Sequence, residues 1–277
     1  MTTLSPELAG QIDRIVREVV AHEVRPHFGR IAPEAVAKKS SAIDLVTAAD
    51  QAAERELIAR LTALMPEADV FGEETVAEDP ARLDAIATSD QAVVIDPIDG
   101  TWNYAKGIAV FGTIIAVISG GETVFGLIHD PISGESIQAH RGGGAWCLTP
   151  DGKSAAISVA ADDPAEGAPV GLVGSDWMRH PGFPALAAPF ARVSCHGASA
   201  HDYRSLCTGR YHASICYGLN AWDHAAGQLI HAEAGGVSGL SNGQPYSPKL
   251  RAGRLILAHT PELLEELQQI VLTVDAA

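Results

Sequence analysis

The segment 96–101, Asp-Pro-Ile-Asp-Gly-Thr, constrains this chain more than any other. It follows the apolar run 92–95, which predicts a short buried strand that ends at Asp96. Two carboxylates three residues apart, with a proline between them, predict a bent strand exit at which both face one space. Gly100 and Thr101 then open a helix or turn, whose free N–H groups can bind an anion. Carboxylates for hard cations beside amides for a phosphate favour metal-assisted phosphoryl chemistry, although the same residues are also common in simple turns.

Two further acidic segments also allow either a structural or a functional interpretation. Glu73 and Glu74 follow a glycine in the run 71–75, and a charge pair of this kind is typical of a solvated loop. Asp223 precedes the small residues 225–227, and alone it could cap a helix. Neither segment indicates a function by itself.

In their order and spacing, Gly-Glu-Glu, Asp-Pro-Ile-Asp-Gly-Thr and Trp-Asp-x-Ala-Ala-Gly resemble the inositol monophosphatase family. Members of that family are Mg²⁺-dependent, Li⁺-sensitive phosphomonoesterases. The resemblance extends to the segments 44–50 and 197–200, so it spans roughly residues 40–240. It implies a layered αβαβα sandwich, an α+β fold, with a hydrolase of small phosphorylated polyols or related metabolites as the expected function.

The resemblance also implies roles for individual residues. The expected ligands of the metals are Glu73, Asp96 and the Ile98 carbonyl for the first ion, with Asp96 bridging to a second ion held by Asp99 and Asp223. Two or three Mg²⁺ ions are expected, and Mn²⁺ is a possible substitute because the ligands are all oxygen atoms. Li⁺ inhibition is expected through the site of Asp96, Asp99 and Asp223.

The expected nucleophile is a water molecule whose pKa the first metal lowers. Thr101 resembles the hydroxyl that orients this water, with Asp50 as its acidic partner, and Glu73 completes the expected catalytic set. The amides of Gly100 and Thr101 are expected to hold the phosphate, and Asp223 to face the substrate. Glu74 is interpreted as shaping its loop, and Asp44 as a turn or helix-start residue.

The alcohol side of the site departs from the animal inositol monophosphatases. Cys216 stands seven residues before Asp223, where those enzymes carry a glutamate that contacts inositol hydroxyls. Trp102 and Tyr104 are bulkier than is common after the phosphate-binding turn, and they could stack on a substrate ring or fill the core. Histidinol phosphate, fructose 1,6-bisphosphate and 3′-phosphoadenosine phosphates therefore remain alternative substrates.

Other functions are compatible with the same sequence. A non-catalytic phosphoester-binding or regulatory protein can share this scaffold, and one bacterial branch of the family has an RNA-associated role. Histidines in the C-terminal third suggest a zinc site only weakly, because no H-x-x-x-H or H-E-x-x-H pattern is present. His224 could touch substrate, and Arg204 and Arg210 could contact an anion or lie on the surface.

The net charge of −15, from 34 acidic and 19 basic side chains, disfavours a nucleic-acid partner. No apolar run is long enough for a transmembrane helix, so no membrane partner is expected. The four cysteines lack C-x-x-C spacing and the N-terminus lacks a signal-peptide pattern, which favours a cytoplasmic protein. The resemblance adds a homodimer as the expected assembly.

Hydrophobic periodicity predicts the main elements. The expected helices are 6–24, one that ends near residue 66, 223–234 and 261–272, and the expected strands are 111–118 and 123–128, paired as a hairpin, 213–217 and 255–258. The chain of 277 residues is expected to form one domain, 1–277, of two apposed halves that meet at approximately residues 160–169.

Overall fold

The computed structural model describes residues 4–30, 36–38, 45–159, 171–174 and 182–275. Its larger sheet has seven strands in the order β3-β4-β5-β6-β7-β8-β9, antiparallel throughout except for the parallel pair β3 and β4. The strands are β3 (Asp69–Gly72), β4 (Gln91–Asp99), β5 (Gly112–Ser119), β6 (Glu122–His129), β7 (Ser136–His140), β8 (Ala145–Leu148) and β9 (Ser154–Ala156).

The smaller sheet has five strands in the order β11-β10-β12-β14-β13. Its strands are β10 (Gly171–Val173), β11 (Arg192–Ser194), β12 (Ala213–Gly218), β13 (Val237–Leu240) and β14 (Ala252–Ala258). β10 runs parallel to β11 and β12, whereas β14 is antiparallel to β12 and β13. A further two-stranded pair consists of β1 (Val36–Lys38) and β2 (Leu45–Thr47).

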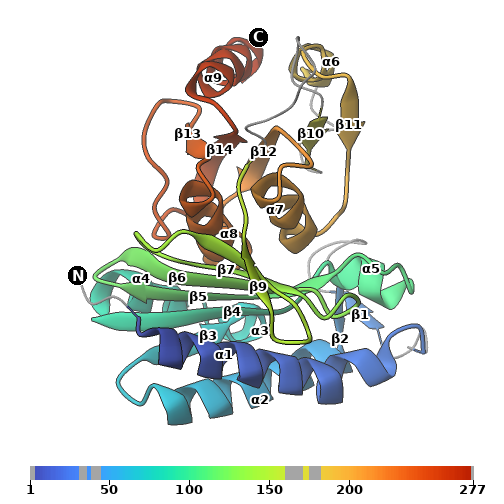
Figure 1. The fold of residues 1–277 in the computed structure, drawn as a ribbon, viewed down its shortest axis with the longest axis vertical. Helices are drawn as coiled ribbons and strands as arrows, with labels where there is room; N and C mark the ends of the chain where they lie inside the picture. Colours follow the sequence, from blue (N-terminus) through green and yellow to red (C-terminus); the bar gives the residue numbers. More distant parts are fainter. Residues whose placement is uncertain (1–3, 31–35, 39–44, 160–170, 175–181, 276–277) are drawn as a thin grey trace.

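The helices form layers around these sheets. They are α1 (Pro6–Val19), α2 (Ala48–Leu64), α3 (Glu73–Glu78), α4 (Ala85–Thr88), α5 (Thr101–Ala105), α6 (Phe183–Ala187), α7 (Ser199–Cys207), α8 (Ala221–Glu233) and α9 (Pro261–Asp275). A π-helical turn (Val20–Val24) and a 3-10 turn (Arg25–His27) continue α1, and a second 3-10 turn (Pro80–Asp84) precedes α4. Figure 1 shows α1 and α2 below the larger sheet, α7 and α8 between the two sheets, and α6 and α9 beyond the smaller sheet.

The central strands of both sheets are buried on both faces, which is why the protein is layered. Along β5, Ile115 packs with α1 and α2, while its neighbour Ile114 packs with α7 and α8. Along β14, Leu257 faces the same central helices and Ile256 faces α9. Because side chains alternate between the faces of a strand, continuous apolar runs in β5 and β14 require cover on both sides. The result is the expected αβαβα order of an α+β fold.

The predicted elements are confirmed with shifted ends. The long N-terminal helical run, the hairpin of β5 and β6, and the final strand and helix all form. The strand expected to end at Asp96 is longer, because β4 continues to Asp99. Asp223 does not cap α8, since Asn220 is the N-cap residue and Asp223 lies in the first turn. Asp44 and the expected boundary at 160–169 lie outside the described residues.

Candidate metal centre

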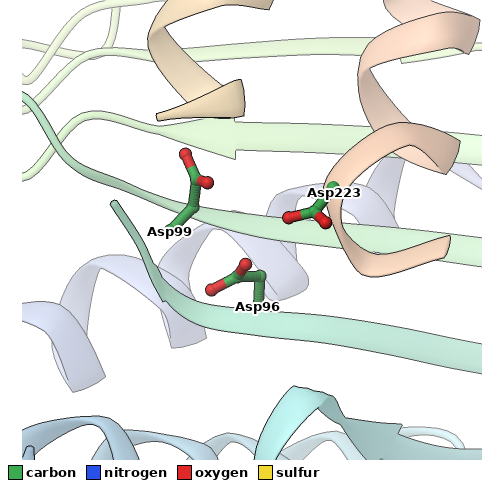
Figure 2. A group of neighbouring side chains, drawn as sticks. All are labelled: Asp96, Asp99 and Asp223. Carbon is green, nitrogen blue, oxygen red and sulfur yellow. The ribbon is translucent and has the colours of Figure 1, made fainter. Parts of the chain in front are cut away.

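Three carboxylates converge where β4 ends and α8 begins. Figure 2 shows Asp96 and Asp99 at the end of β4, facing Asp223 on the first turn of α8. One carboxylate oxygen from each residue lies within 4.8 Å of the others. Asp96 is 1% exposed and Asp99 is 6% exposed, while Asp223 is half-buried. The segments 96–101 and 221–227 therefore meet at one site, although they are far apart in the sequence.

An irregularity in β4 turns Asp96 and Asp99 toward the same space. Asp96 pairs with Ile114 and Asp99 pairs with Gly112, so three steps along β4 oppose two steps along β5. Residues three apart on a regular strand point to opposite faces, and one extra residue restores them to the same face. Thr113 holds the irregular segment because its hydroxyl donates to the Pro97 carbonyl at 2.8 Å. The bent exit expected from the proline is thus a bulge within the strand.

Burial and mutual repulsion shift the pKa values of these acids upward. Burial raises the pKa of Asp96 well above its ordinary value, and the charges of Glu73, Asp99, Asp223 and Asp50 raise it further. Burial likewise raises the pKa of Asp99 to about 7, even though the amides of Ala200 and Ser199 favour its charged form. A folded chain that holds several acids this close stores unfavourable electrostatic energy unless a cation or protons neutralise them.

The hydrogen bonds of the two β4 acids differ. Asp99 accepts from the amide of Ser199 at 3.1 Å and from that of Ala200 at 2.7 Å, which fixes its carboxylate at the start of α7. The Oδ1 atom of Asp96 is buried without a hydrogen-bond partner among the described residues. A buried oxygen of this kind costs about 1–3 kcal/mol when nothing binds it. The donor set of buried carboxylates with an unsatisfied oxygen fits a hard divalent cation.

Thr101 and Asp50 form a hydrogen-bonded pair beside the carboxylates. The Thr101 hydroxyl lies 3.0 Å from Asp50 Oδ1 and 3.0 Å from the Ile98 carbonyl, both of which are acceptors. The other carboxylate oxygen of Asp50 accepts from the amide and hydroxyl of Thr47, in a capping box at the start of α2. Burial raises the pKa of Asp50 to about 6, against the opposing effect of these hydrogen bonds. Thr47 was not anticipated from the sequence.

Gly100 permits the turn that places Thr101. It has φ 83°, in the left-handed region, and it is the N-cap of α5. A Cβ atom at this position would lie 2.8 Å from the Cβ of Ala198 and 3.1 Å from the Val110 carbonyl. Only glycine meets both requirements. The expected helix start at Gly100 and Thr101 is therefore confirmed.

Glu73 and Glu74 open a helix rather than a solvated loop. Both lie in the first turn of α3, directly after β3, which is parallel to β4. In addition to burial, the charge of Glu73 raises the pKa of Asp96, Asp99 and Asp50. Glu73 thus contributes to the field of the acidic site, although the three convergent carboxylates are Asp96, Asp99 and Asp223.

The side of the site that carries Cys216 is built from neutral groups. Burial raises the pKa of the Tyr203 and Tyr246 phenols, and the charge of Asp223 raises it further. The Tyr203 hydroxyl lies 3.1 Å from Nδ1 of His224, and burial lowers the pKa of His224 to about 4. His224 is therefore a buried, neutral residue. Nothing in the sequence marks Tyr203 or Tyr246 as part of this region.

Burial and contacts narrow the alternatives that the sequence leaves open for three residues. Arg204 is not a surface charge, since it is buried against Asp130 at 3.4 Å and Glu135 at 3.1 Å. Tyr104 fills the core, where its hydroxyl donates to the Val24 carbonyl at 2.8 Å. Trp102 instead remains 38% exposed beside the Gly100 turn.

Comparisons with known proteins point to one family. The model of the inositol monophosphatase family matches residues 8–275. The chain is 29% identical to the fructose-1,6-bisphosphatase/inositol-1-monophosphatase of Thermotoga maritima, over 79% of each chain. It is 33% identical to the Nus factor SuhB of Haemophilus influenzae, over 82% of each chain.

A solved structure supports the same assignment. The structure of an IMPase from Thermotoga maritima superposes with a TM-score of 0.81 at 26% identity, covering 98% of this chain and 99% of that one. Within the described part of the chain, no helix is both long enough and apolar enough to cross a membrane. With a family match over nearly the whole sequence and the acidic motifs gathered at one site, this chain belongs to the inositol monophosphatase family, a family of phosphomonoester hydrolases.

Proposed function

We propose that this protein is a Mg²⁺-dependent hydrolase of a small phosphorylated polyol or a related metabolite. The observation that carries the proposal is the convergence of Asp96, Asp99 and Asp223 within 4.8 Å, two of them buried, beside the Gly100 turn. Hydrolysis of phosphate monoesters is among the slowest uncatalysed reactions, and one acid or base supplies only about 10²–10⁴-fold acceleration. Charge neutralisation and positioning must supply most of the rest.

Mg²⁺ fits the donors present at this site. Asp96, Asp99 and Asp223 would hold it, with Glu73 and the Ile98 carbonyl as the further oxygen ligands for the two or three ions we propose, and Mn²⁺ as a substitute. Bound there, such ions supply positive charge to the phosphate and lower the pKa of a nucleophilic water. The chain itself carries a net charge of −15, so its own field repels a phosphate monoester until cations are bound.

Thr101 and Asp50 are proposed to orient the attacking water. The Thr101 hydroxyl, 3.0 Å from Asp50 Oδ1, can donate its proton to that carboxylate and use a lone pair to accept one from water. The raised pKa of Asp50, about 6, makes its carboxylate a stronger proton acceptor than an exposed aspartate. Thr47 keeps Asp50 in place by occupying its second oxygen.

The backbone at the start of α5 is proposed to hold the phosphate. Residues Gly100 and Thr101 carry amide groups that no preceding helical turn can satisfy. Gly100 allows the turn that starts the helix, and the free amides at such a start favour a bound phosphate oxygen. Asp223 lies across the site, where a leaving alcohol would face it and the neighbouring Cys216.

Neutral groups on the alcohol side favour a substrate other than inositol 1-phosphate. Cys216 cannot accept hydrogen bonds from sugar hydroxyls as a glutamate does, because a thiol is a weak acceptor. Histidinol phosphate, fructose 1,6-bisphosphate and 3′-phosphoadenosine 5′-phosphate are the alternatives that we would test first. One relative is named a fructose-1,6-bisphosphatase/inositol-1-monophosphatase, which supports the inclusion of a sugar bisphosphate.

The proposal extends to the state of the protein in the cell. We propose a cytoplasmic homodimer built from a single domain, 1–277. None of the four cysteines forms a disulfide, as expected of a protein in a reducing compartment. The core around α7 and α8 contains residues of both sheets, as expected if the two halves fold together.

Phosphate release tests the proposal directly. Inositol 1-phosphate and the three alternative substrates are incubated with Mg²⁺, with EDTA, and with Mg²⁺ plus Li⁺. Release from one compound that requires Mg²⁺ and falls with Li⁺ supports the proposed chemistry and identifies the substrate. Release that persists in EDTA contradicts it. Binding of these phosphate esters without turnover would instead support a non-catalytic role. One relative is named a Nus factor.

A further inference from the structure

Glu54 is a buried acid for which the proposed mechanism has no use. It lies on α2 with 2% of its surface exposed, four residues after Asp50. Residues four apart lie on the same face of a helix, so α2 presents two buried carboxylates in a row. Asp50 contacts Thr101, whereas Glu54 points to a different element. A carboxylate buried to this degree requires strong hydrogen bonds to be tolerated.

The hydrogen bonds of Glu54 all come from the start of α3. Its Oε2 atom accepts from the amide of Glu74 at 2.8 Å, and its Oε1 atom accepts from the amide of Thr75 at 2.7 Å. The hydroxyl of Thr75 donates to the same Oε1 atom. These are the second and third residues of α3, whose amides have no partner within the helix.

Gly72 makes room for this arrangement. It is the N-cap residue of α3 and provides no side-chain cap. A Cβ atom there would lie 2.4 Å from Glu54 Oε2 and 2.5 Å from its Cδ. Its φ of −134° is open to any residue, so space and not backbone strain requires the glycine. Glu54 therefore caps α3 from another helix, in place of the serine, threonine or aspartate that usually precedes a helix.

The cap fixes the residue that enters the acidic site. Glu73 is the first residue of α3, between Gly72 and the two amides that Glu54 binds, and its charge reaches Asp96. We infer that Glu54 is a positioning residue, which holds the first turn of α3 so that Glu73 is presented to the metals. Together with Asp50, it makes α2 the common support for Thr101 and Glu73. This inference rests on the proposed metal-dependent function.

Mg²⁺ binding to the Glu54→Gln variant tests the inference. Glutamine keeps the shape but turns one acceptor into an N–H donor that faces the amides of α3. Outer-shell partners of metal ligands are typically worth 10–100-fold in affinity, so we expect the Kd for Mg²⁺ to rise by about tenfold. At saturating Mg²⁺, kcat should fall by less than about threefold, since no group that contacts the substrate has changed. Glu56→Gln, at an exposed position on the same helix, is the matched control and should bind Mg²⁺ like the wild type.

Calorimetry on the folded variants, checked by circular dichroism, gives the readout independently of turnover. A Glu54→Gln protein that binds Mg²⁺ within about twofold of the wild type, well below the change expected for an outer-shell partner, would overturn the inference. If that variant does not fold, Gly72→Ala provides the same test, because its methyl group displaces Glu54 while every metal ligand is kept. Unchanged Mg²⁺ affinity in Gly72→Ala would also overturn it.

A double variant separates positioning from a general loss of packing. The Glu54→Ala change removes the atoms with which a Cβ atom at position 72 would collide. We therefore expect the pair Glu54→Ala and Gly72→Ala to bind Mg²⁺ as weakly as Glu54→Ala alone. Additive losses would contradict a shared role. Wild-type protein that binds Mg²⁺ but releases no phosphate would overturn the proposed function and leave the comparison of Mg²⁺ affinities valid.

Discussion

The two sides of the site differ in the charge of their side chains. On the β4 side, Asp96, Asp99 and Thr101 follow one another within a single bulged strand and helix start, and α2 supports them from behind. On the α8 side, Asp223 stands among the neutral groups of Cys216 and Tyr246. The first side concentrates charge at an electrostatic cost, whereas the second leaves little charge with which to recognise an alcohol. In the proposed function, the reaction type depends on the first side and the choice of substrate on the second.

The largest expected effect comes from removing the central charge. Asp96→Asn should lower kcat/KM for the preferred phosphate ester by about 1,000-fold or more, which is about 4 kcal/mol of transition-state stabilisation. Its Mg²⁺ affinity should fall as well, because the unsatisfied Oδ1 atom is lost or neutralised. Asp90→Asn serves as the control, because Asp90 is exposed and directly precedes β4. Activity of Asp96→Asn within threefold of the wild type would refute its role.

The next effect separates water orientation from metal binding. Thr101→Ala should lower kcat by about 100-fold, in the range of a single proton-transfer group. The Kd for Mg²⁺ should change little, because the hydroxyl is not itself a proposed ligand and the Ile98 carbonyl that accepts its hydrogen bond is kept in the variant. Thr101→Ser keeps the hydroxyl and should retain most activity. A Thr101→Ala enzyme with a normal kcat and weaker Mg²⁺ binding would contradict the assignment.

The free energy of unfolding in EDTA measures how much the buried acids of the β4 side destabilise the folded chain. Burial raises the folded-state pKa of Asp96 well above its ordinary value and that of Asp99 to about 7. The folded chain therefore keeps protons that the unfolded chain releases near pH 4. Their contribution to stability is complete below that pH and is lost as the pH rises through about 7.

Asp96→Asn removes one of these charges. The stability of the variant should therefore increase relative to that of the wild type as the pH rises. Between pH 5 and pH 8 in EDTA, we expect the free energy of unfolding of the variant to increase relative to that of the wild type. Urea denaturation at both pH values measures this difference. A variant that is equally or more destabilised at pH 8 would show that the acids are not in mutual repulsion.

The smallest effect concerns the alcohol side. Cys216→Glu should improve kcat/KM for inositol 1-phosphate by about tenfold, roughly the 1.4 kcal/mol of one hydrogen bond to a charged group. Mg²⁺ affinity should change little, and Cys216→Ser provides a control of similar size. The absence of any gain would mean that Tyr203 and Tyr246 shape a pocket unlike that of the animal enzymes.

The contrast between the sides also explains what could be predicted from the sequence. The charged residues of the β4 side lie within one short segment, so the sequence predicts both their motif and the helix start that follows it. The bulge was not, because it depends on the pairing of Asp96 with Ile114 and of Asp99 with Gly112, on the next strand of the sheet. The strand was accordingly expected to end too early. Tyr104 and Trp102, two residues apart, could be separated only by their burial.

Long-range contacts account for the remaining misses. Glu54 is an ordinary helix residue in the sequence, and its role becomes visible only where α2 meets the amides of α3. The sequence leaves Arg204 open between an anion contact and a surface charge, because nothing local identifies Asp130 as its partner. Tyr246 belongs to the alcohol side only through the packing of both sheets around α8. Local patterns thus predicted the convergent carboxylates better than the groups that support them.

Anomalous scattering from crystals soaked in Mn²⁺ tests the central claim most directly. We predict a strong anomalous peak within bonding distance of Asp96, Asp99 and Asp223, lost in Asp96→Asn crystals and accompanied by phosphate release that requires the metal. A site without Mn²⁺ in an enzyme that still releases phosphate in EDTA would contradict the account.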